Sequence, residues 1–172
     1  KEQFLAIPAP PQGRVHHRFD PTVHILRTEY DPEEPVYLAI DPGYSGQPSH
    51  YAVLALQKKT LTGGPQWQVI DEIWEEGLTA IQICDMVKQR FWWKNPSITG
   101  VIDIAGKAHA GAMESNVEVW FRETGLNLRM NRVQVLAGID RFNSMLEVDP
   151  MTKEPRLIID PKCAGIISEL GG

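Results

Sequence analysis

Val36-Tyr37-Leu38-Ala39-Ile40-Asp41-Pro42-Gly43 is an apolar run that ends in an aspartate and a turn. The run Ile98-Thr99-Gly100-Val101-Ile102-Asp103-Ile104-Ala105-Gly106 has the same pattern. Each run predicts a buried strand that carries a carboxylate to its C-terminal end. If the two strands lie side by side, Asp41 and Asp103 converge, and two carboxylates held together are usually relieved by a shared proton or a divalent cation. The pair therefore predicts a metal-dependent phosphodiesterase.

The segments around these runs predict a mixed sheet. Two further strands, Tyr51–Leu56 and Trp67–Trp74, follow the first run closely, which indicates an antiparallel meander. Thr79 and the apolar residues after it predict a helix, and a crossover through this helix makes the Asp103 strand parallel to its neighbour. The remaining segments predict helices over 113–124 and 139–146, a strand over 128–135, a short extended piece over 156–159, and a last helix with Asp160 as its N-cap.

This order of elements is that of the ribonuclease H-like fold. We expect an α/β domain over residues 36–172, with a mixed five-stranded sheet in which three antiparallel strands are followed by parallel ones and helices cover both faces. Residues 1–35 are rich in proline, and we interpret them as a linker or arm that packs on this domain. The chain begins without a methionine, which fits a junction to something upstream.

Composition and charge restrict the function further. The chain has 172 residues, 42% of them hydrophobic, which suits one globular domain with a sizeable core. No apolar run approaches the roughly 20 residues that span a bilayer, so no membrane partner is expected. The net charge of −5 gives no general attraction for nucleic acid, and a nuclease would need a local basic track. Cys84 and Cys163 form no metal-ligand or disulfide pattern, which favours reduced thiols inside a cell.

The two aspartates fit a site for Mg²⁺ or Mn²⁺, because both ions prefer oxygen ligands. Two such ions about 4 Å apart hold the attacking water and the leaving oxygen of a phosphodiester. Each aspartate also has a plainer interpretation, since Asp41 could begin an Asp-Pro-Gly turn and Asp103 could cap the next segment or face water. A third acid normally completes such a site, and none stands out among Asp71, Glu72, Asp140, Asp149 and Asp160.

Three basic residues are candidate DNA contacts. Lys107 and His109 follow Asp103 closely, and Arg129 lies in the predicted fifth strand. Taken singly, such residues are more often solvated surface charge. The aromatic run Phe91–Trp93 suggests a base-stacking platform, but a helix end packed onto the sheet explains it better. No phosphate-binding Gly-x-x-x-x-Gly-Lys motif is present, so the sequence excludes P-loop nucleotide hydrolysis within this chain.

Four blocks together resemble the nuclease domain of the large terminase subunit of tailed bacteriophages. They are Tyr37–Gly43, Val69–Glu72, Val101–Asp103 and Leu157–Cys163, and the segment Gly13–Leu26 resembles the part that joins the motor to the nuclease in that family. The resemblance implies a divalent-metal-dependent endodeoxyribonuclease that cuts concatemeric viral DNA during genome packaging. It implies that Asp41 and Asp103 are the catalytic ligands of Mg²⁺ or Mn²⁺ in a two-metal site, with a third acidic ligand in a helix beyond residue 172.

The same resemblance implies the partners. These are double-stranded DNA, the N-terminal packaging ATPase domain of the same polypeptide, the portal and the small terminase subunit, in the cytoplasm of the host cell.

Other functions remain compatible with these residues. Junction resolvases share the fold and begin with a similar block. Actin-like and Hsp70-like ATPases also place an aspartate and a glycine after a first strand, but they need a second related half, which 172 residues do not supply. A non-catalytic domain that binds phosphate or a protein partner would bind no metal at Asp41.

Overall fold

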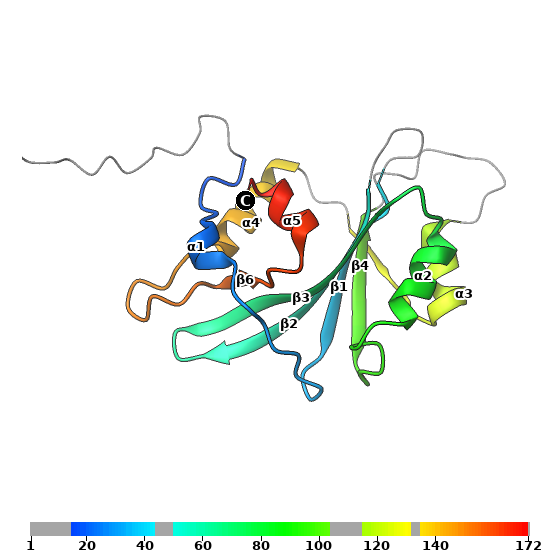
Figure 1. The fold of residues 1–172 in the computed structure, drawn as a ribbon, viewed down its shortest axis with the longest axis horizontal. Coiled ribbons are helices and arrows are strands. Elements are labelled where there is room, and N and C mark those ends of the chain that lie inside the picture. Colours follow the sequence, from blue (N-terminus) through cyan, green and yellow to red (C-terminus); the bar gives the residue numbers. More distant parts are fainter. Residues whose placement is uncertain (1–14, 44–49, 104–114, 132–134, 172) are drawn as a thin grey trace, which may run out of the picture.

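A mixed sheet forms the centre of the molecule, and helices lie against both of its faces (Figure 1). The computed structural model describes residues 15–43, 50–103, 115–131 and 135–171. The strands are β1 (Val36–Asp41), β2 (His50–Leu61), β3 (Gly64–Glu76), β4 (Ile98–Asp103), β5 (Arg129–Asn131) and β6 (Leu157–Ile159). The helices are α1 (Pro21–His24), α2 (Ala80–Lys88), α3 (Asn116–Thr124), α4 (Val135–Met145) and α5 (Ala164–Glu169). None of the described helices is long and apolar enough to cross a membrane.

The strands follow the order β5-β4-β1-β2-β3-β6 across the sheet. β1, β2 and β3 are antiparallel neighbours, while β4 pairs in parallel with β1 and β5 pairs in parallel with β4. The predicted ribonuclease H-like arrangement is therefore confirmed. The sheet has six strands rather than the five predicted, because the piece expected over 156–159 forms β6 and pairs in parallel with β3 at the far edge.

One face of the sheet packs against α2 and α3, which lie together in Figure 1. Alternate residues of β1, namely Val36, Leu38 and Ile40, are buried in this core, and Ile102 of β4 joins them. Trp92 is also buried there, as expected for a helix end packed onto the sheet. We call this side of the sheet the helix face.

Capping residues determine where the two helices of the helix face begin. Thr79 and Ser115 each accept a hydrogen bond from a backbone N–H in the first turn, and the side chains of Gln82 and Glu118 accept one from the backbone of the cap. Because Ser115 is the N-cap of α3, this helix begins at Asn116 rather than near residue 113 as predicted.

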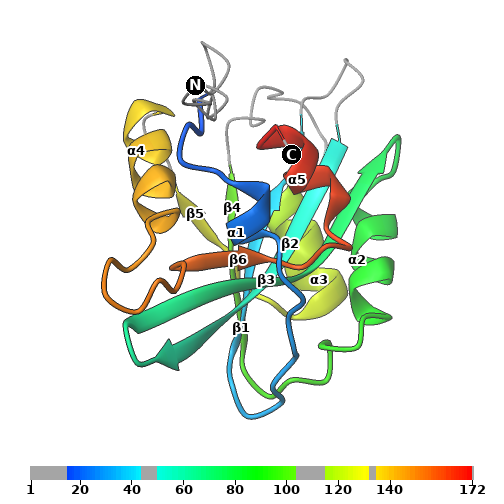
Figure 2. The same cartoon turned by 60° about the vertical axis from the view of Figure 1, so that its left-hand side comes forward.

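The opposite side of the sheet, which we call the open face, carries α1, α4 and α5 (Figures 1 and 2). A second buried cluster on this side includes Val69 of β3, Leu157 and Ile159 of β6, and Leu170 after α5. This cluster covers the part of the sheet near β3 and β6. The region over β4 is less covered, because the side chain of Val101 is 42% exposed.

Residues of the proline-rich arm contact β6 and the end of α4. His24 of α1 is buried, and its Nε2 lies 2.9 Å from the carbonyl oxygen of Leu146. The N–H of Leu26 donates to the carbonyl oxygen of Ile159 at 3.1 Å. These bonds attach residues 20–28 to the open face.

Asp160 does not cap the last helix, so that prediction was wrong. Its carboxylate accepts hydrogen bonds from the N–H and the hydroxyl of Thr28, both at 2.9 Å, and from the N–H of Lys162 at 3.2 Å. α5 begins only at Ala164, after Cys163. The donors of Thr28 occupy the carboxylate, and Asp160 therefore holds the arm against the end of β6.

Candidate functional site

Asp41 and Asp103 end neighbouring parallel strands. β1 and β4 are paired in register up to Ile40 and Ile102, and each aspartate is the next residue of its strand. Because neighbouring strands lie about 4.8 Å apart, the two aspartate backbones are adjacent at the C-terminal ends of β1 and β4. The prediction that these two strands lie side by side is confirmed.

Both aspartate side chains point to the open face. Ile40 and Ile102 are buried on the helix face, and successive side chains of a strand alternate, so Asp41 and Asp103 project from the other side. Both residues are exposed. Ligands of open α/β sheets bind outside the carboxyl ends of parallel strands, and this pair lies at such an end.

The turn after β1 holds one oxygen of Asp41. The N–H of Gly43 donates to Asp41 Oδ1 at 2.8 Å, and Gly43 has a φ of 70°, which glycine adopts without strain. The turn interpretation of Asp41 and the metal-ligand interpretation are therefore compatible. One carboxylate oxygen closes the turn, and a carboxylate has a second oxygen for a ligand.

Tyr51 of β2 joins the start of α3 to this edge of the sheet. Burial raises the pKa of Tyr51, and the negative charge of Asp41 adds to the rise, so the phenol keeps its proton. Its hydroxyl donates to Asn116 Oδ1 at 2.9 Å and accepts a hydrogen bond from Trp120 Nε1 at 2.7 Å. The helix N-terminus on the helix face is thereby fixed near the strand ends.

α5 approaches the sheet closely beside the aspartate pair. Asp41 pairs with Ala52 of β2 and Ala52 with Trp74 of β3, so these side chains share a row on the open face. A Cβ atom at Gly165 would lie only 2.2 Å from Cδ2 of Trp74, so α5 contacts the indole directly. The two carboxylate oxygens of Glu72 accept the N–H groups of Gly165 at 2.8 Å and of Ile166 at 2.7 Å. α5 therefore bounds this region on the β3 side.

Arg129 lies on the same face as the aspartates. It pairs with Val101 across β4 and β5, and Val101 shares its side of β4 with Asp103. Arg129 is exposed, so it provides a positive charge on the open face near the acids. The other predicted DNA contacts, Lys107 and His109, lie outside the described residues.

The two aspartates fit part of a divalent cation site. Their donors are all oxygen, which suits Mg²⁺ or Mn²⁺ better than softer metals. Within the described part of the chain, no group of three His, Cys, Asp or Glu residues could hold a metal ion. Most of the acids considered as third ligands have other partners. Asp71 accepts from Trp92 Nε1 at 2.8 Å on the helix face, and Asp160 binds Thr28. Glu72 binds the first turn of α5, and Asp149 accepts from backbone N–H groups of its own turn.

Sequence reasoning missed three residues near this site. Glu72 is expected only as a possible third acid, Trp74 only as a residue of a strand, and no role is predicted for His50. The available signal was the alternation of β3, which places Glu72 and Trp74 on one side and Asp71 on the other. Their partner, α5, lies far along the chain, and no local pattern indicates that contact.

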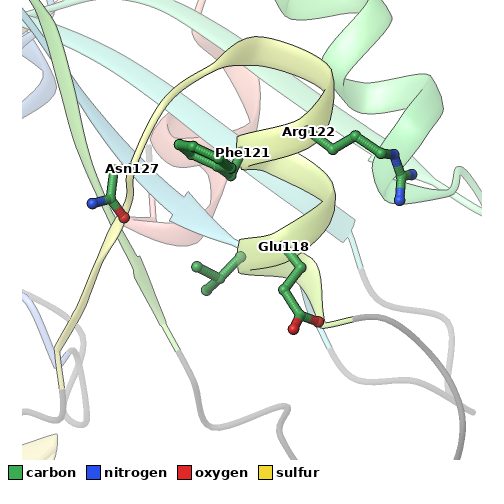
Figure 3. Close-up of a pocket in the computed structure, with 5 residues that line it drawn as sticks. Glu118, Phe121, Arg122 and Asn127 are labelled. Atoms are coloured by element: carbon green, nitrogen blue, oxygen red, sulfur yellow. The ribbon is translucent and has the colours of Figure 1, made fainter.

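A separate pocket lies on α3, away from the aspartates. Val117, Glu118, Phe121, Arg122 and Asn127 line it. Phe121 of α3 points toward Asn127 in the segment before β5, whereas Arg122 points the other way (Figure 3). Because α3 covers the helix face, this pocket is not part of the aspartate site.

Comparisons with known proteins give likenesses in structure alone. No protein-family model and no curated protein matches the chain. The nuclease domain of the P22 large terminase has a TM-score of 0.64 at 16% identity, and the match covers 93% of this chain and 78% of that one. The nuclease domain of the large terminase g2p of bacteriophage SPP1, solved with bound Mn, has a TM-score of 0.54 at 14% identity over 86% of this chain and 74% of that one.

The large terminase of a thermophilic bacteriophage is also similar, with a TM-score of 0.64 and 14% identity. That match covers 93% of this chain but 36% of the thermophilic phage protein, so the chain spans about a third of the length of that relative. At these identities the likeness establishes the fold, which is that of large terminase nuclease domains.

Proposed function

We propose that this domain is a DNA endonuclease that depends on Mg²⁺ or Mn²⁺. The observation that carries the proposal is the pair Asp41 and Asp103, which end adjacent parallel strands on an exposed face. The fold is that of terminase nuclease domains, one of which was solved with Mn, and this likeness supports the same chemistry. Arg129 adds a positive charge on that face for the DNA backbone.

Asp41 and Asp103 would hold the cation through carboxylate oxygens. A bound divalent cation supplies Lewis-acid activation of the phosphodiester and of the attacking water. The chain's own residues orient the ligands: Gly43 holds one oxygen of Asp41 in the turn, and β1 keeps Asp41 in register with β4. Without a cation, the two negative charges would repel a DNA phosphate, so binding of metal and of substrate are coupled.

We infer that the natural substrate is concatemeric viral DNA and that the domain acts beside a packaging ATPase. The large terminase of the thermophilic bacteriophage, which is similar to this chain over part of its length, was solved in complex with ATP-γ-S, and that complex supports a partner that uses nucleotide. The portal, the small terminase subunit and the cytoplasm of the host cell belong to the same proposal.

Nicking of supercoiled plasmid in Mn²⁺ tests the proposal. Asp41→Asn and Asp103→Asn keep the size of the side chain and remove its charge, and we expect each variant to lose nicking by at least about 100-fold. Calorimetric titration with Mn²⁺ should show binding to the wild-type chain and much weaker binding to both variants.

Asp85→Asn is a matched control, because Asp85 is exposed on α2, on the other side of the sheet. It should nick plasmid at the wild-type rate. Nicking at the wild-type rate by either strand-end variant, with metal still required, would show that the site lies elsewhere. A preference for four-way junctions over plasmid by more than about 100-fold would favour a resolvase.

A further inference from the structure

His50 lies beside the aspartate pair on the open face. Asp41 pairs with Ala52 of β2, and His50 is two residues from Ala52 on the same side of that strand. His50 is therefore the diagonal neighbour of Asp41, and such neighbours are about 7–8 Å apart, within reach of long or aromatic side chains. Because β2 is antiparallel to β1, His50 lies beyond Asp41, past the C-terminal end of β1.

Two side chains of β3 hold the imidazole in place. The ring of His50 lies 4.9 Å from that of Trp74, tilted by 32°. Its Nε2 lies 3.4 Å from Oε1 of Glu76, the residue opposite it on β3. α5 in turn holds Trp74 in place, because Gly165 contacts the indole and Glu72 binds the first turn of this helix.

A cross-strand pair on the surface would explain these contacts in structural terms alone. The side chains of His50 and Glu76 are 39% and 55% exposed, however, and an ion pair with such exposure contributes little to stability. The pair instead holds an imidazole at an exposed strand end, diagonally across from Asp41. In an imidazolium both ring nitrogens are donors, so Nε2 can donate to Glu76 while Nδ1 remains for an anion.

We propose that His50 binds a phosphate of the DNA strand next to the phosphate held at Asp41 and Asp103. This inference rests on the proposed nuclease function and adds a substrate contact to the same site. Glu76 and Trp74 are positioning residues, because they act on the imidazole and not on the DNA. Glu76 and Asp41 are the charged groups that flank His50 on β3 and β1.

The test separates DNA binding from chemistry. Plasmid nicking in Mn²⁺ is measured for the wild-type chain and for His50→Gln under the same conditions. We expect KM to rise about 5- to 20-fold with kcat changed less than about threefold, since a lost phosphate contact weakens binding of the substrate and the transition state alike. The negative slope of log kcat/KM against log salt should become shallower by about 1.

Two further variants distinguish a phosphate contact from a structural role. His50→Arg keeps a cationic donor and should restore KM to within about threefold of wild type. His17→Gln makes the same change at an exposed histidine of the arm and should leave KM unchanged. Calorimetric Mn²⁺ binding should be the same in wild type and His50→Gln.

Three results would overturn the proposal. They are an unchanged KM in His50→Gln, a fall in kcat without a rise in KM, and weaker Mn²⁺ binding, which would make His50 a metal ligand. If the wild-type chain nicks plasmid while His50→Gln matches it, the nuclease function stands and the His50 contact falls. A wild-type chain that neither binds nor cuts DNA removes both.

Discussion

Gly165 lets α5 lie directly against Trp74 of β3. It has no side chain, and this lets the helix backbone contact the indole of Trp74, where a Cβ atom would lie 2.2 to 2.6 Å from three ring atoms. Trp74 in turn supports the ring of His50. The absence of a side chain at Gly165 therefore lets α5 pack against Trp74, and Trp74 in turn contacts His50 near the aspartates.

We expect Gly165→Ala to destabilise the fold by about 1–3 kcal/mol, the usual cost of overpacking. Alanine has a higher helix propensity than glycine, so propensity alone would stabilise the variant. A lower free energy of unfolding would therefore report the clash with Trp74. Urea unfolding followed by tryptophan fluorescence measures it.

Ser168→Ala provides the control for Gly165→Ala, because Ser168 is an exposed residue of the same helix. Its free energy of unfolding should stay within about 0.5 kcal/mol of wild type. A Gly165→Ala variant as stable as wild type would mean that α5 does not press on the indole.

At the scale of elements, the links between β6, α5 and the arm decide how the open face is covered. Asp160 binds Thr28 of the arm and Lys162 of the β6–α5 connection. Burial alone would raise the pKa of Asp160, but the hydrogen bonds from Thr28 and Lys162 outweigh burial, and the net effect is a lowered pKa. The charged carboxylate is therefore the form that stabilises the fold.

Asp160→Asn should lower the free energy of unfolding by about 1.5–3 kcal/mol at neutral pH, the usual contribution of hydrogen bonds to a charged group. Because the folded pKa lies below the unfolded value of about 3.9, the contribution of Asp160 is present above that pH and is lost as the pH falls through the folded value. Urea unfolding at pH 7 and near pH 3 should show a large difference between variant and wild type at pH 7 and a small one in acid.

Asp140→Asn removes an exposed carboxylate of α4 and should have little effect at either pH. An Asp160→Asn variant that loses as much stability in acid as at pH 7 would show that the charge of Asp160 is not the cause.

Asp160 also illustrates how far sequence reasoning reaches. Asp-Pro before an apolar segment is a strong local signal for a helix start, yet a hydroxyl more than a hundred residues earlier binds the carboxylate instead. The strands that carry Asp41 and Asp103 were predictable because each apolar run is visible in the sequence and the crossover through a helix makes the second strand parallel, whereas their pairing in register is seen only in the structure. The support of α5 by Glu72 was not predictable, since it depends on how two distant elements meet.

At the scale of the whole molecule, the sheet separates two cores. Cys84 of α2 is buried in the core of the helix face, and Cys163 before α5 is buried in that of the open face. Burial is the largest cause that raises the pKa of each thiol, to about 12 in both cases, and both cysteines are free. Each thiol therefore reports on one face of the sheet.

We expect both thiols to resist a thiol reagent at pH 8 in native buffer, because each is buried and the reagent needs the thiolate. If the sheet couples the two cores, both should become reactive over the same range of urea, as in a two-state transition. The variants Cys84→Ala and Cys163→Ala leave one thiol each, so colorimetric labelling follows each face separately. Because both folded pKa values exceed the unfolded value of about 8.5, the stability from the protonated thiols is complete below that pH and is lost as the pH rises toward 12.

Reaction of Cys163 at a urea concentration where Cys84 stays protected would show that the open face unfolds first. The aspartate site would then be bounded by an element that can open while the helix face stays folded.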